Sequence, residues 1–173
     1  LSGNGSPSGI INGDNVSLTG GTATFSGANA GLNNVTITGL GLTGSEANNY
    51  ILSQPTGLSA TINKANLTLS GTKTYDGTTA VAGSTLTATG VAGQTFTITG
   101  AGDASNLASK NVQNNSTLGS TTGLSLGTSS NGGLSSNYNV LSTAGSHYSV
   151  TPKGITLTGI TAVDKVYDAT TTA

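Results

Sequence analysis

The chain has 173 residues and little charge, because its 5 lysines and 6 acidic residues leave a net charge of −1. So few cations exclude the basic surface that nucleic-acid binding needs, and one His with no Cys excludes a histidine or cysteine metal site and a disulfide framework. No apolar run approaches the roughly 20 residues that cross a bilayer, so we expect no membrane insertion. We also expect no bound metal and no cofactor.

Short runs in which apolar residues alternate with Thr or Ser follow one another along the chain, and this alternation predicts half-buried strands. The clearest are Val16 to Thr19, Val35 to Thr38 and Thr95 to Thr99. Further runs occur at residues 49–53, 58–62, 67–70, 86–89, 123–126, 138–141, 148–151 and 155–158. Gly, Asn, Asp or Pro separates nearly all of them, as tight turns require. The sequence therefore predicts an all-β protein.

Parts of the chain repeat one another. Three patterns occur twice: Ile62–Gly71 and Val150–Gly159, Lys73–Thr79 and Lys165–Thr171, and Asn49–Tyr50 and Asn137–Tyr138. The second copy carries extra residues from Ser116 to Gly133, which we interpret as an insertion in a surface loop. Self-similarity at so long a period predicts two copies of one structural unit.

These motifs resemble the YDG repeat, which occurs in large secreted surface proteins of Gram-negative bacteria alongside filamentous-haemagglutinin-type adhesins. The resemblance is carried by Lys-x-Tyr-Asp-Gly-Thr-Thr at 73–79, by the element from Gly39 to Tyr50, and by Asn-Lys or Pro-Lys before an alternating strand. Ala169 stands where the family has Gly, which disfavours the positive φ of a tight turn at that position.

The resemblance implies tandem immunoglobulin-like β-sandwich units. The residues favour the same architecture, because turn signals separate strands every 8–12 residues or so. A β-solenoid is the alternative, but its coils would repeat about every 20 residues, a much shorter period than the one found here.

The phase of the repeat predicts three parts. Residues 1–63 form a sandwich unit that lacks its opening strands, residues 64–153 form a complete unit, and residues 154–173 carry the opening strands of a following unit. A sheet with a gap and a free strand favour donation of that strand, head to tail, to another molecule. The alternative is a window on a longer tandem array, in which the peptide chain itself supplies the strand. The apolar residues expected to enter the acceptor are Ile155, Leu157, Ile160, Val166 and, as the main anchor, Tyr167.

The repeated Tyr-Asp pair predicts a turn, formed by Tyr75, Asp76 and Gly77 in one copy and by Tyr167 and Asp168 in the other. Asp before small residues favours an Asx turn, in which the carboxylate accepts hydrogen bonds from backbone amides. The alternative is an intramolecular isopeptide bond, made from the amine of a lysine such as Lys73 or Lys165.

No pair of nucleophile and base can be named in this sequence, so we expect no enzyme. The resemblance implies a structural module at the bacterial cell surface or in a secreted extracellular fibre, acting in adhesion, biofilm or cell contact. Its partners would be further copies of itself or further repeats in the same chain. The alternative is a module whose loops bind a glycan or a host protein.

Overall fold

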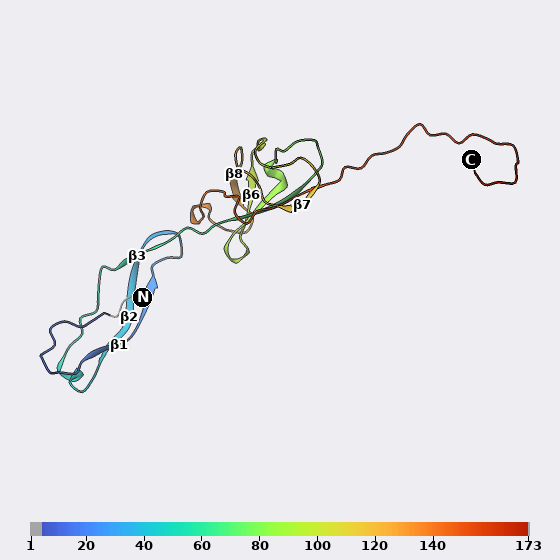
Figure 1. The fold of residues 1–173 in the computed structure, drawn as a ribbon. Helices are drawn as coiled ribbons and strands as arrows, with labels where there is room; N and C mark the ends of the chain where they lie inside the picture. Colours follow the sequence, from blue (N-terminus) through green and yellow to red (C-terminus); the bar gives the residue numbers. More distant parts are fainter. Residues whose placement is uncertain (1–4, 173) are drawn as a thin grey trace.

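The computed structural model describes residues 5–172, and within them the chain is all-β, as the alternating pattern predicts. The strands form two sheets that follow one another along the chain. Figure 1 shows these two sheets in succession, with the chain after Pro152 running away from both. The described residues contain no helix that is long and apolar enough to cross a membrane.

The first unit is a three-stranded antiparallel sheet in the order β1-β2-β3. β1 (Ser17–Phe25) and β2 (Gly31–Thr43) form a long hairpin, and β3 (Ser59–Ile62) pairs with the beginning of β2. β3 is the last strand of its sheet, so one of its edges faces no strand within residues 5–172. Such an edge presents a row of backbone donors and acceptors that another strand can pair with.

The second unit is a six-stranded sheet in the order β7-β9-β4-β5-β6-β8. Its strands are β4 (Thr68–Thr74), β5 (Leu86–Thr89), β6 (Thr95–Thr99), β7 (Gln113–Ser116), β8 (Ser125–Ser129) and β9 (His147–Thr151). β4 lies in the middle of the sheet, parallel to β9 on one side and antiparallel to β5 on the other. The other neighbouring pairs are antiparallel.

The hydrophobic core lies in the second unit. It is formed by Leu67, Leu69, Val81, Leu86, Ala88, Phe96, Ile98, Leu107, Leu118, Tyr138, Tyr148 and Val150. By contrast, no side chain between residues 5 and 66 is buried. A three-stranded sheet that buries nothing fully has little to offset the entropy of ordering its chain. We therefore expect the first unit to depend on a further element for its stability.

Residues 116–133 are not the surface-loop insertion that the sequence comparison predicts. They contain β8, which pairs with β6, and they bury Leu118 in the core. In the first unit one continuous strand, β2, pairs with both of its neighbours. In the second unit the chain is divided there into β7 and β8, and between them Leu118 enters the core and Leu124 packs against it. The extra residues therefore extend the core.

Some predicted strands are not formed. Residues 49–53 and 138–141 follow the 3₁₀ turns η1 (Ala47–Asn49) and η4 (Ser135–Asn137), and only Tyr138 makes a bridge, to Ala65. Residues 155–158 lie in the exposed tail, where no neighbouring strand is present to pair with them. The antiparallel pairs also differ from the parallel stacking of a β-solenoid, which the structure therefore does not support.

Asn137 joins the two units. Its Oδ1 accepts a hydrogen bond from Ala30 N at 2.9 Å, and its Nδ2 donates to Asn29 Oδ1 at 3.1 Å. Its backbone oxygen accepts from Ala65 N at 3.0 Å. The loop between β1 and β2 is thereby tied to the turn that precedes Tyr138.

Candidate assembly site

Lys73 closes the loop that follows β4. Its Nζ donates to Asp76 Oδ1 at 3.0 Å, to the backbone oxygens of Thr78 at 2.9 Å and Ala80 at 2.7 Å, and to Thr78 Oγ1 at 3.1 Å. Only 7% of the Lys73 side chain is exposed. A buried ammonium is tolerated when it is paired and its protons are hydrogen-bonded, and here both conditions are met. We call residues 73–80 the lysine clasp.

Asp76 forms the Asx turn that the sequence favours. Its Oδ1 accepts hydrogen bonds from Thr78 N and from Thr78 Oγ1, both at 2.9 Å. The bond from the Thr78 amide, together with that from Lys73, holds the pKa of Asp76 to about 2, below its ordinary value of 3.8. Tyr75, next to it, packs against the core and donates its amide to Thr151 O at 2.8 Å. The motif thus fixes the end of β4 beside β9.

The tail repeats the lysine clasp without any sheet around it. Lys165 Nζ donates to Asp168 Oδ1 at 2.9 Å, to the backbone oxygens of Thr170 and Thr172 at 3.0 and 2.6 Å, and to Thr170 Oγ1 at 2.8 Å. This second clasp, residues 165–172, is more open, because 36% of the Lys165 side chain is exposed. The hydrogen bond from Lys165 is the main cause that lowers the pKa of Asp168. The motif therefore folds locally.

In each of the two copies, the lysine and the aspartate form an ion pair, and the aspartate lies in a turn. For Lys73, Asp76 is the carboxylate in contact, and for Lys165 it is Asp168. No second carboxylate hydrogen-bonds to either ammonium within residues 5–172. The isopeptide alternative gains no support from this geometry, since such a bond needs an additional acid beside the pair.

Gly77 and Ala169 occupy the same turn position, and both have a positive φ, of 82° and 59°. Ala169 therefore keeps the turn, although its residue type disfavours it. We predict that Gly77→Ala lowers the free energy of unfolding of the second unit by about 1 kcal/mol, through backbone strain alone, because an added Cβ would meet no atom within 4 Å. Urea unfolding measures this, and a loss well above that size would show a steric cause.

The pKa of Asp76 makes the second unit sensitive to acid. Because that pKa is lower in the folded chain than in the unfolded one, the carboxylate stabilises the fold fully above about pH 4 and loses this contribution as the pH falls towards 2. We predict that the urea midpoint of the Asp76→Asn variant changes less between pH 5 and pH 2 than that of the natural chain. Equal changes in both proteins would contradict the assignment.

A second arrangement that occurs in both units is a tyrosine hydroxyl that hydrogen-bonds to a segment earlier in the chain. Tyr138 OH accepts from Val91 N at 2.9 Å and donates to Gln94 Oε1 at 2.7 Å. In the first unit Tyr50 OH accepts from Ile11 N at 2.9 Å and donates to Asp14 Oδ2 at 2.7 Å. We call this the tyrosine latch. The two latches align residues 11–14 of the first unit with residues 91–94 of the second.

An apolar groove of about 650 Å³ lies on the first unit. Its lining comes from residues before β1, from residues between β2 and β3, and from side chains of β1 and β2 that include Leu18, Ile37, Leu40 and Leu42. Leu18 pairs with Leu42 as Ile98 pairs with Leu126 in the second unit. Ile98 is buried in the core, whereas Leu18 is only half-buried. The groove thus lies where the second unit has its core.

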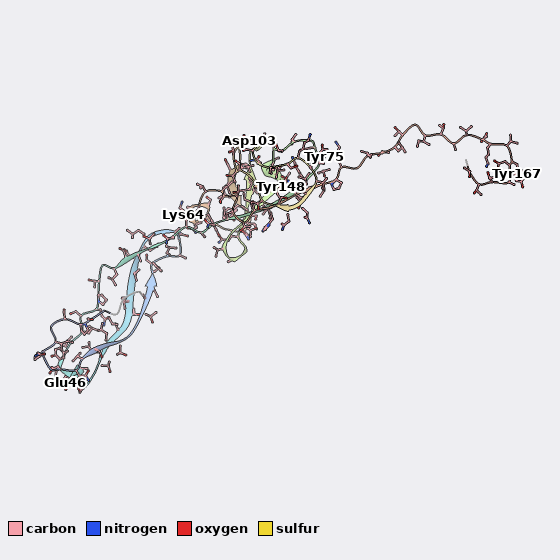
Figure 2. All side chains as sticks on the ribbon, viewed as in Figure 1. Glu46, Lys64, Tyr75, Asp103, Tyr148 and Tyr167 are labelled. Carbon is pink, nitrogen blue, oxygen red and sulfur yellow. The ribbon has the colours of Figure 1, made fainter. Side chains whose placement is uncertain are left out.

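The tail exposes the apolar residues that the sequence predicts for a donated strand. Their exposed fractions are 97% for Ile155, 78% for Leu157, 73% for Ile160, 89% for Val166 and 90% for Tyr167. Figure 2 shows Tyr167 at the end of the tail, apart from its counterpart Tyr75 in the second unit. None of these five side chains is covered within the described chain, so the residues are available for another surface.

Asn106 is a structural residue that the sequence analysis missed. It is fully buried, its Oδ1 accepts from Val81 N and Asp103 N, and its Nδ2 donates to Ser120 O and Thr122 O. It thereby holds the segment after the lysine clasp against the chain before β8. No signal separates it from the many other Asn residues of this chain, because its role depends on contacts far apart in sequence.

Comparison with protein families and structures gives one result. The family model of the YDG domain matches the chain twice, over residues 1–57 and 59–146. No curated protein and no solved structure matches. The two matches meet at Leu58, directly before β3, and together they cover most of the chain.

Proposed function

Because this chain belongs to the YDG domain family, we propose that it is a structural repeat module of a secreted bacterial surface fibre or adhesin, in which successive units join head to tail by completing one another's sheets. One observation carries the proposal. No side chain between residues 5 and 66 is buried, while the tail exposes residues 155–159, which match Leu67–Gly71 at the beginning of a strand that is central in the second unit. Such a chain is suited to forming a continuous fibre in which each unit is held to the next.

The geometry supports a structural role in further ways. The repeated lysines and aspartates hydrogen-bond within the clasps, and the repeated tyrosines Tyr50 and Tyr138 hydrogen-bond within the latches. In the proposed fibre, the second unit is one complete repeat. The first unit becomes a further complete repeat when a strand is added to its sheet. In that state we propose the same immunoglobulin-like β-sandwich for both.

Surface location can be tested on intact cells of a bacterium that produces the protein. Protease added outside should release peptides from residues 5–172, while a cytoplasmic marker protein stays uncut. A chain that is cut only after the cells are opened would contradict the proposal, whatever its state of assembly.

The binding module is the other outcome to test. A structural module should not be retained on immobilised glycans or host matrix proteins, because its role does not require a ligand. Specific retention of the purified chain, abolished by free glycan, would favour loop-mediated recognition instead. The residues from Ser116 to Gly133 are poorly suited to that role, since they include β8 and the buried Leu118.

A further inference from the structure

We propose that residues 155–172 of one copy of this chain bind the first unit of a second copy as a central strand, parallel to β3, with Thr158 opposite Ser59. The inference rests on the proposed head-to-tail function and specifies its partner, site and register. The occupant is a second copy, because the interface already exists once in this chain, between β4 and β9 of the second unit.

The beginning of the tail matches the beginning of β4 and the residue before it. Leu67-Thr68-Leu69-Ser70-Gly71 corresponds to Ile155-Thr156-Leu157-Thr158-Gly159, residue by residue. In the second unit Leu67 and Leu69 are only 3% and 0% exposed. Ile155 and Leu157 have the same alternation and are exposed. Since alternate residues of a strand face the same side, these two would enter a core together.

The first unit offers the matching position. In the second unit β4 lies between β9 and β5. β3 corresponds to β9, because Asn49–Tyr50 and Asn137–Tyr138 precede the two strands by equal distances along the chain. The tyrosine latches align residues 6–9 with β5. The groove is lined by residues from both regions, because its lining includes Ser6, Pro7 and Ser8 as well as Leu58, which directly precedes β3.

The two parts also carry complementary devices. The second unit has both a lysine clasp and a tyrosine latch. The described part of the first unit has a latch, formed by Tyr50, and no clasp. The tail has a clasp, formed by Lys165, and no latch. The first unit and a tail together therefore have the same two devices as the second unit.

The register follows from the second unit. There Ser70 of β4 is the partner of His147 of β9, and both side chains are exposed. The equivalent residues are Thr158 and Ser59, which are exposed as well. A cysteine at each position would lie on the outer face of the completed sheet, within reach of a disulfide. The chain has no cysteine of its own to compete with such a bond.

The register is tested by mixing two single variants of the full chain, Ser59→Cys and Thr158→Cys, under mild oxidation. The expected main product is the disulfide-linked heterodimer. The control mixes Thr61→Cys with Thr158→Cys, whose Cα atoms would be about 8 Å apart, beyond the reach of a disulfide. The double variant Ser59→Cys/Thr158→Cys should form a ladder of linked multimers. A linked monomer, equal yields in the control, or no linkage at all would overturn the proposal.

Leu157 and Val163 provide a matched pair for affinity. Both are apolar and exposed, but Val163 lies between Gly159 and Lys165, where the tail has five residues and the second unit has only Thr72 between Gly71 and Lys73. In sedimentation experiments, Leu157→Asp should weaken self-association by about 100-fold or more, because it places a charge in the core, and Val163→Asp should leave it nearly unchanged. A chain that stays monomeric at all concentrations, or equal losses in the two variants, would overturn the docking site. The cell-surface experiment would still decide the proposed function separately.

Discussion

The substitution Leu69→Ala should lower the free energy of unfolding of the second unit by about 3 kcal/mol. Leu69 lies in β4, the central strand, and its side chain is fully buried against the core. Its truncation removes methyl groups from the core and leaves a cavity that central strands are poorly placed to close. Urea unfolding of the 173-residue chain, followed by hydrogen exchange of the β5 and β6 amides, measures the loss.

Leu157→Ala is the matched control for this prediction, because Leu157 has the same place in the repeat and is exposed. At concentrations low enough to keep the chain monomeric, this variant should unfold as the natural chain does, within about 0.5 kcal/mol. A large loss in dilute Leu157→Ala would mean that the tail already packs within its own molecule. A small loss in Leu69→Ala would mean that the core described for the second unit is wrong.

The class of fold could be predicted from the sequence because Thr and Ser alternate with apolar residues over short runs, and this period has one common structural meaning. The strand Thr95–Thr99 was predicted with the bounds of β6. The same reasoning predicted a strand at 155–158, where none is formed. Alternation indicates that a segment can form a strand, but it does not indicate whether a neighbouring strand is present to pair with it.

The lysine clasp was only partly visible in the sequence. The sequence named Lys73 only as the amine of an alternative isopeptide bond and Asp76 as the centre of an Asx turn, and the structure has the hydrogen bond from Thr78 N to Asp76 Oδ1. The hydrogen bonds from Lys73 to the backbone oxygens of Thr78 and Ala80 could not be foreseen, because they depend on the path of the loop. The role of the motif is therefore to satisfy a buried ammonium with oxygens supplied by the next few residues.

The insertion was misread for a physical reason. Extra residues rich in Ser, Gly and Asn favour a surface loop, but they also suit a β unit in which apolar residues are sparse. Here a few side chains, such as Leu118 and Leu126, are enough to draw the segment inward. In a chain with so few apolar residues, each one carries a large share of the core, so composition alone is a poor guide to burial.

The same scarcity of apolar residues explains why the lysine clasp should matter for stability. Lys73→Ala is expected to lower the free energy of unfolding of the second unit by about 3 kcal/mol, because it leaves the oxygens of Thr78 and Ala80 without their donor and removes a buried ion-pair partner of Asp76. The melting temperature should fall by more than about 10 °C, as a loss of that size implies for a unit of this length.

Lys165→Ala removes the same hydrogen bonds from the clasp in the tail and serves as the control. In the monomer it should change the melting temperature of the second unit little, because that clasp lies outside the folded core. On assembly Lys165→Ala should become destabilising as well, since docking of the tail would bury Lys165 as Lys73 is buried now. If Lys165→Ala left the assembled chain as stable as the natural one, the clasp would contribute to its own loop alone, and the equivalence of tail and β4 would end at Gly159.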